Sequence, residues 1–167
     1  MNLTRTASAL AVATLVAATS AGCSTFGDLF AEDAVRDDDT NEVVEGGSVD
    51  IFSIAPGDCI ADNLEDTEYS TVSVVPCSEP HDGEVYFTYT FAEPEYPGDD
   101  VIQSTGDEQC YDAFEDFIGI PWDESAYYYG YFYPNQTTWD ENDDREIDCY
   151  VYDETGQVTG TLEGVAS

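Results

Sequence analysis

Residues 74–91 read "VVPCSEPHDGEVYFTYTF" and set the kind of sheet that this chain can form. Apolar and polar side chains alternate along residues 69–75 and again along residues 84–91, which is the period of half-buried β-strands. Between the two runs, "SEPHDG" is rich in turn-forming residues and ends in a glycine, which tolerates a positive φ. The stretch therefore predicts two consecutive strands whose connection holds the only histidine of the chain, His81. The side chains expected on one face of the second strand are Val85, Phe87, Tyr89 and Phe91.

The segments that follow predict one main helix and two further strands. Residues 97–121 place apolar side chains at helical spacing, and Gly119 before Pro121 predicts the end of that helix. "AYYYGYFYP" at residues 126–134 and "REIDCYVYD" at residues 145–153 alternate as strands do. Strands, then a helix, then strands predict an α+β domain around a mostly antiparallel sheet.

The amino terminus predicts export. An apolar run at residues 7–19 is shorter than the roughly 20 residues that a membrane-spanning helix needs, and a single basic residue precedes it. Small residues then precede Cys23, as in the lipobox of bacterial lipoproteins, whereas ordinary signal cleavage after Ala21 is the alternative. Residues 1–22 are therefore expected to be a lipoprotein signal peptide, with palmitate and diacylglycerol on Cys23.

The number of cysteines favours lipidation of Cys23. Exported chains enter an oxidising compartment, in which five cysteines would leave one unpaired and four can pair completely. The remaining four allow three pairings, and the sequence does not choose among them. Economy favours Cys59 with Cys77, which would pin the start of the domain to its first hairpin, and Cys110 with Cys149, which would clip the helix to the sheet.

The chain is strongly acidic. It has 37 Asp plus Glu residues against 3 Lys plus Arg, and a formal net charge of −34. Such a surface repels nucleic acid, which is therefore not an expected partner. Acids scattered along the whole chain are typical of a surface adapted to high salt, with diffuse cation binding or attraction to a basic partner as alternatives.

Composition also predicts the domain limits. Residues 23–48 are acidic, contain a Gly-Gly break and show little periodicity, which predicts a flexible tether between the lipid and the domain. Aromatic and β-branched residues become dense from residue 49, so residues 49–165 are expected to form one globular domain.

His81 allows several hypotheses. It lies four residues after Cys77, but a metal site needs about four clustered ligands, and the chain has neither a second histidine nor a Cys-x-x-Cys pair. A catalytic base needs a nucleophile, and no Gly-x-Ser-x-Gly motif is present. The favoured interpretation is a structural histidine hydrogen-bonded to a carboxylate such as Glu84 or Asp58. A partner-binding or pH-sensing residue is the alternative.

Two other groups of residues resemble functional sites. "DENDDREIDCYV" at residues 140–151 resembles a calcium loop, but Arg145 stands at the position of the sharp-turn glycine and Val151 at that of the bidentate glutamate. Arg145 is expected instead to pair with neighbouring acids. The tyrosines of residues 127–133 could present rings to a sugar polymer, but their alternation predicts packing on the sheet.

Several motifs together resemble the septum formation family of small exported domains of Gram-positive bacteria. They are "APGDCI", "VVPCSEPHDGEV", a helix with an internal cysteine, "YFYPNQTTW" and "DDREIDCYVYDETGQVTGTLEG". The residues that match the family's motifs are Gly57, Asp58, Cys59, Cys77, Pro80, His81, Glu84, Val85, Cys110, Pro134, Trp139, Asp144, Arg145 and Cys149. Asp143 departs from the family, which usually has a glycine there. The resemblance implies an exported or membrane-tethered domain associated with septum formation, and implies no established catalytic activity.

The sequence thus favours a non-enzymatic interaction domain, lipid-anchored at the outer face of the cell membrane, with secretion as the alternative. The expected partners are the membrane, through the lipid, and an unknown envelope or division protein. No catalytic residue, metal or cofactor is expected. The alternatives are an envelope enzyme that uses paired carboxylates on a glycan, and a lipoprotein that binds a small ligand or cation. The candidate binding residues are Asp58, His81, Glu84, Trp139 and Arg145.

Overall fold

A computed structural model describes residues 33–62, 64 and 70–167. The expected signal peptide and the lipidated Cys23 lie outside the described residues, so both stay predictions.

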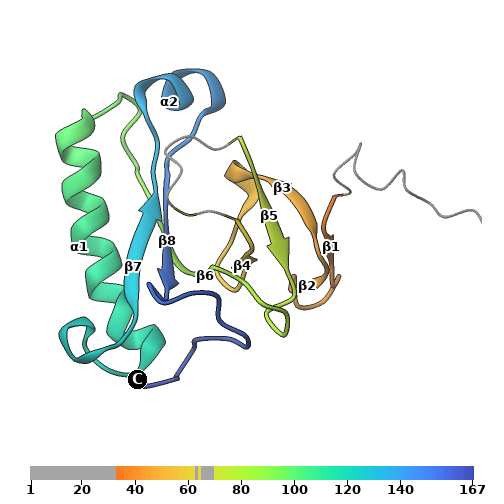
Figure 1. Cartoon of the computed structure of the whole chain (residues 1–167). Coiled ribbons are helices and arrows are strands. Elements are labelled where there is room, and N and C mark those ends of the chain that lie inside the picture. The colour runs from red at the N-terminus through yellow and green to blue at the C-terminus, as the bar shows by residue number, and fades with distance from the viewer. Residues whose placement is uncertain (1–32, 63, 65–69) are drawn as a thin grey trace, which may run out of the picture. The chain divides into compact units, whose positions relative to one another are not determined.

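One antiparallel sheet forms the centre of the fold (Figure 1). Its six strands, in spatial order, are β3 (Gly47–Asp50), β5 (Thr71–Val75), β4 (Cys59–Ile60), β6 (Gly83–Thr90), β8 (Glu146–Tyr152) and β7 (Tyr128–Phe132). All neighbouring strands pair antiparallel. The predicted α+β class with a mostly antiparallel sheet and one main helix is therefore confirmed.

The two strands predicted from residues 74–91 exist as β5 and β6, but they do not form a hairpin. β4 lies between them and pairs with both. A second difference comes from a β-bulge in β6, where the register shifts between Val85 and Phe87. A bulge moves the side chains before and after it out of simple alternation. Val85 therefore packs in a different core cluster from Phe87, Tyr89 and Phe91, and the prediction that all four share a face is wrong.

The predicted helix is α1 (Asp99–Ile118), and it covers one face of β6, β8 and β7. Its buried residues recur every four positions and end at Ile118. Gly106 is one of them. The Tyr131 ring packs so closely against it that a Cβ at this position would lie 2.5 Å from the ring. Gly119 ends the helix with a φ of 95°, and its N–H donates to the Glu115 carbonyl at 2.9 Å.

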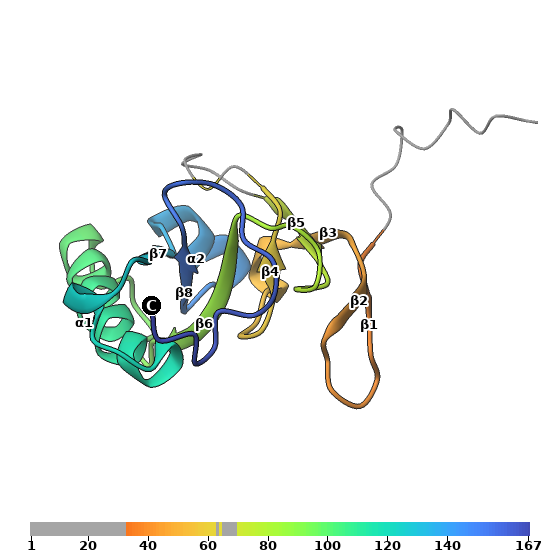
Figure 2. The same cartoon turned by 60° about the horizontal axis from the view of Figure 1, so that its bottom comes forward.

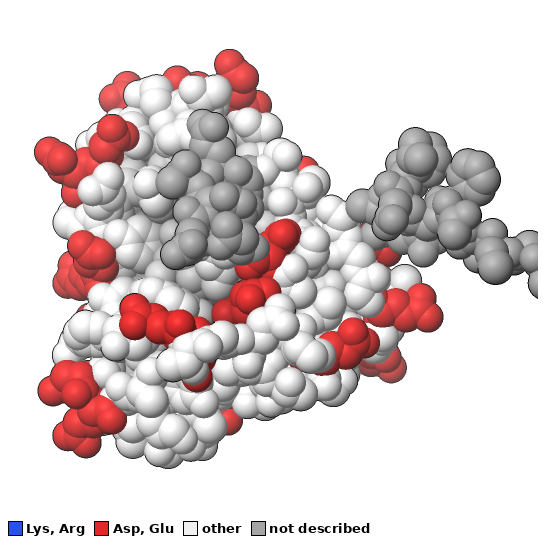
Figure 3. All heavy atoms as spheres, viewed as in Figure 1, with Lys and Arg blue, Asp and Glu red and all other residues white. Residues whose placement is uncertain are grey.

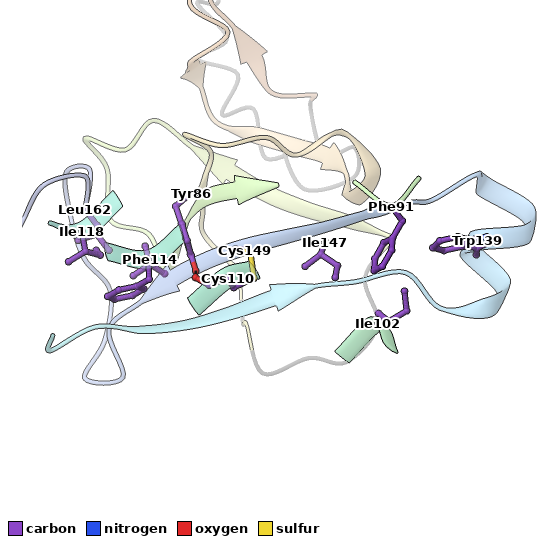
Figure 4. Close-up of a cluster of buried hydrophobic side chains, with 11 residues drawn as sticks. Tyr86, Phe91, Ile102, Cys110, Phe114, Ile118, Trp139, Ile147, Cys149 and Leu162 are labelled. Atoms are coloured by element: carbon purple, nitrogen blue, oxygen red, sulfur yellow. A yellow bond between two sulfur atoms is a disulfide. The ribbon is translucent and has the colours of Figure 1, made fainter. Parts of the chain in front are cut away.

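The main core lies between α1 and the sheet (Figure 4). Tyr86 points from β6 toward the helix and donates its hydroxyl to the Cys110 carbonyl at 2.5 Å. A second cluster, built mainly from the N-terminal strands, contains Val43, Ile51, Ile54, Ile60, Val72, Val74 and Val85.

Both disulfides of the economical pairing are present. Cys59 pairs with Cys77 at a Cα–Cα distance of 5.2 Å, and Cys110 pairs with Cys149 at 5.5 Å. The first bridge joins β4 to the connection after β5. The second joins α1 to β8, as expected.

The N-terminal segment differs from the expected tether. Residues 33–48 contain β1 (Val35–Arg36), β2 (Val43–Glu45) and the start of β3, and β1 and β2 form a ribbon of their own (Figure 2). Val43 is only 7% exposed and belongs to the second core cluster. The ordered domain therefore begins before residue 49. The acidic composition concealed this, because single valines among many acids give no periodic signal.

Three short helical segments were not predicted: η1 (Ile51–Ser53), η2 (Trp122–Glu124) and α2 (Gln136–Asn142). Asn135 caps α2 by accepting from the Thr137 and Thr138 amides. Asp143 ends it with a φ of 56°, in the left-handed region that favours glycine and tolerates aspartate. This explains how Asp143 can replace the glycine that the septum formation family usually has there.

Candidate functional site

His81 is fully buried and fastens the C-terminal segment, residues 157–165, to the sheet. Its backbone N–H donates to the Val158 carbonyl at 3.0 Å, and its own carbonyl accepts from the Val158 amide at 2.9 Å. The ring Nδ1 lies 2.9 Å from the Glu79 carbonyl, so the histidine's partner is a backbone carbonyl and not the expected carboxylate. Nε2 is buried without a hydrogen-bond partner among the described residues.

Glu84 holds the same C-terminal segment. Its carboxylate accepts from the Thr161 hydroxyl at 2.7 Å and from the Leu162 amide at 2.6 Å. Burial raises the pKa of the Glu84 carboxyl, and these two hydrogen bonds oppose the rise. The amide of Gly160 adds a bond to the Cys77 carbonyl at 2.6 Å. The histidine and the glutamate of the family motif are therefore both anchors for the last part of the chain.

Asp58 holds the N-terminal part of the described chain. Its carboxylate is 2% exposed and accepts from both Nη atoms of Arg36, at 2.5 and 2.8 Å. The Ala55 amide donates a further bond at 2.9 Å. The hydrogen bond to Asp58 raises the pKa of the Arg36 guanidinium. Arg36, which the sequence placed in the tether, thus joins the N-terminal ribbon to the sheet.

Trp139 and Arg145 lie together at α2. Trp139 is 1% exposed, and the Arg145 guanidinium lies 4.0 Å from the centre of its ring. Arg145 Nη1 donates to the carbonyls of Trp139 and Asp144, and Nη2 pairs with the exposed Asp143 at 3.1 Å. The expectation that Arg145 pairs with a neighbouring acid is confirmed. The structure thus separates the five candidate residues into two groups, with Asp58, His81 and Glu84 near the Cys59–Cys77 bridge and the other two at α2.

The described residues contain one group of three candidate metal ligands within 4.8 Å of one another: Cys59, Cys77 and Glu84. The two cysteines are bonded to each other, so their sulfurs are not thiolates that could hold a metal. With the disulfide formed, these three residues have a structural role and do not make a metal site.

A groove of about 880 Å³ lies beside β8, β7, η1 and α2. We call it the Asp148 groove. Ile147 and Cys149 belong to the core under α1, so Asp148 between them faces the other side of the sheet. Four acids line the groove: Asp143, Asp144, Glu146 and Asp148. The aromatic residues that line it are Phe52, Tyr131, Phe132, Tyr133 and Tyr150.

Asp148 is the least exposed acid of this groove, at 6%. Its Oδ1 accepts from the Thr88 hydroxyl at 2.6 Å, and its Oδ2 takes no hydrogen bond from the described residues. Burial raises the pKa of Asp148 to about 7, and the negative charges of Glu146, Asp144 and Asp58 add to the rise, whereas the Thr88 bond opposes it. Glu146 has a similar cross-strand partner, accepting from the Thr90 hydroxyl at 3.4 Å.

Sequence reasoning missed this groove. The available signal was the run "EIDCYVY" at residues 146–152, in which Asp148 stands between the apolar Ile147 and Cys149. Every position from Ile147 to Val151 is buried, so both faces of β8 are covered. An acid in a strand that is buried on both faces marks a site more strongly than an acid on an open face.

Comparison with known proteins identifies the family. The septum formation family model matches residues 56–166, and the chain belongs to this family. No curated protein and no solved structure matches it. Membership indicates a role related to cell division or to the cell envelope, and is consistent with an extracytoplasmic protein. None of the helices among the described residues has the length and apolar character required to cross a bilayer.

Proposed function

We propose that this protein is a non-enzymatic interaction domain, anchored by lipid on Cys23 at the outer face of the cell membrane, that engages a protein of the division septum or the envelope. Membership of the septum formation family supports a role at the division septum or the envelope. The lipobox and the complete pairing of the other four cysteines support the anchor.

The observation that carries the proposal is how the family's motif residues are used. Asp58, His81 and Glu84 all serve as anchors for the two ends of the chain. Each of them is engaged by groups of the protein itself, namely a guanidinium, backbone groups and the Thr161 hydroxyl. A scaffold in which these three motif residues are structural, and whose surface carries a groove that two further motif residues line, Asp144 and Arg145, is suited to binding.

Two experiments test this function. Metabolic labelling with a palmitate analogue should mark the wild type and not Cys23→Ala, and an unlabelled wild type would remove the lipid anchor. A fluorescent fusion should concentrate at division sites, and photocrosslinking in dividing cells should recover a discrete partner. Uniform distribution with no crosslinked product contradicts the proposal.

An envelope enzyme is the second candidate, and the groove supplies the observation that favours it. Glu146 and Asp148 lie two residues apart on one strand, hence about 7 Å apart along it, and aromatic side chains line the same groove. A neutral acid beside an ionised carboxylate is the arrangement of glycosidases. Release of reducing ends from cell-wall glycan, lost in Asp148→Asn, would establish this activity. Absence of release by the wild type removes it.

A further inference from the structure

We propose that the Asp148 groove binds a cationic side chain, lysine or arginine, from a basic segment of a partner protein, and that the cation sits at Asp148 Oδ2. This inference rests on the proposed interaction function and names the chemistry of its partner.

The Asp148 carboxylate is 6% exposed and has one oxygen, Oδ2, that accepts no hydrogen bond from the described residues. A buried carboxylate is costly unless hydrogen bonds or an opposite charge compensate it. Asp148 receives one neutral hydrogen bond, from Thr88, whereas Asp58 nearby receives a bidentate arginine. Asp148 therefore lacks the opposite charge that compensates Asp58. An ammonium or guanidinium group that enters the groove would supply that charge.

The charges around Asp148 also favour a cation. Glu146, Asp144 and Asp58 all act on it with the same sign. Arg145 also lines the groove, but its guanidinium is engaged by Asp143, by two carbonyls and by the Trp139 ring. The described lining thus has an excess of negative charge that its one cation does not neutralise. An incoming cation would relieve this repulsion.

The groove fits an organic cation better than a metal ion. A metal needs several ligand atoms that converge. Among the described residues, the groove acids do not form a group of three whose oxygens lie within 4.8 Å of one another. Phe52 and Tyr133, which are 43% and 51% exposed, offer instead apolar surface to a methylene stem and π-faces to its charge.

The charge of the whole protein favours a basic partner. The face in Figure 3 carries acids in scattered patches over its described surface and shows no Lys or Arg. With a net charge of −34, the chain attracts basic protein segments over long range and repels nucleic acid and anionic headgroups. A basic polypeptide is the occupant that matches both the groove and the field around it.

The test uses the full-length protein in detergent and the peptide Ac-Gly-Lys-Gly-Lys-Gly-NH2, titrated by calorimetry at pH 8 and low salt. The same peptide with Nε-acetylated lysines tests whether charge is required. Asp148→Asn is compared with Asp116→Asn, which removes the same charge from an exposed position on α1. Tyr133→Ala is compared with Tyr111→Ala, since both tyrosines are exposed and contact one other aromatic ring.

We expect Asp148→Asn to weaken binding by about tenfold or more and Asp116→Asn by less than about twofold. Tyr133→Ala should weaken binding, Tyr111→Ala should not, and the acetylated peptide should not bind. Equal losses in the two Asp→Asn variants, equal binding of the acetylated peptide, or no binding to the wild type would each overturn the inference. If the protein binds the peptide but no partner is crosslinked in cells, the proposed function is contradicted and the cation site stands. If a partner is crosslinked in cells but the wild-type protein does not bind the lysine peptide, the inference about the groove is overturned and the proposed function stands.

Discussion

Asp148 on β8 lies directly opposite Thr88 on β6, and its buried carboxylate accepts the threonine hydroxyl at 2.6 Å. This neutral bond is the one hydrogen bond that the described residues give to a carboxylate that is only 6% exposed, so the charge has little compensation from the protein. The protein therefore gives up stability at this position, which is typical of a residue kept for binding.

The pH dependence of stability should reveal this cost. The pKa of Asp148 is raised from 3.8 to about 7, so between these pH values the folded state holds a proton that the unfolded state has released. The contribution of Asp148 therefore falls as pH rises from about 4 to 7, by up to about 4 kcal/mol. We expect Asp148→Asn to be more stable than wild type at pH 8 and about equal near pH 4, measured by urea unfolding. Parallel curves for the two proteins at all pH values would contradict this account.

His81→Ala should impair folding before it impairs binding. The substitution removes a fully buried ring and its bond to the Glu79 carbonyl, so we expect a loss of about 2 to 4 kcal/mol in the free energy of unfolding. Hydrogen exchange should become faster at the Val158 amide, which donates to the His81 carbonyl. Wild-type stability combined with lost binding would instead make His81 a ligand-contacting residue.

Arg36→Ala should release the N-terminal ribbon. Asp58 would lose both bonds from the guanidinium and stay buried, and breaking one half of a buried ion pair is strongly destabilising. We expect proteolysis between residues 33 and 48 to become faster than in the wild type. Asp39→Asn, which changes an exposed charge in the same segment, serves as the control. Equal cleavage of all three proteins would support the flexible tether that composition predicted.

Salt should stabilise the domain. Both arginines of the described residues are already paired, whereas the acids outnumber them many times over, so repulsion dominates at low ionic strength. Screening weakens this repulsion, and we expect the melting temperature to rise between low and molar NaCl. A fall over the same range would mean that specific ion pairs outweigh the general repulsion.

Most of the fold could be predicted from the hydrophobic periodicity and from the number of cysteines. The helix with Cys110 and the strand with Cys149 follow from local patterns, and both are present. The sequence did not choose among the three disulfide pairings, but the economical one is the one that forms. The hairpin expected from residues 74–91 failed because the two-residue strand β4 is too short to show a period and nevertheless separates its neighbours. The bulge at Tyr86 was not predicted for a related reason, because a bulge has no sequence period of its own.

The candidate site was less accessible. His81 and Glu84 could be singled out, but their partners, Val158 and Leu162, lie far along the chain and bind through backbone groups that carry no sequence signal. The Asp148 groove depends on which acid is buried, and among so many acids only the three-dimensional structure identifies one.

The most direct test of the central claim is site-specific photocrosslinking in dividing cells. A photoreactive phenylalanine analogue replaces Tyr133 at the groove or Tyr111 on α1, two exposed tyrosines that lie on different elements. The account predicts a discrete crosslinked partner from position 133 and none from position 111. No product from position 133, or the same products from both positions, would contradict the claim that this groove is where the protein engages its partner.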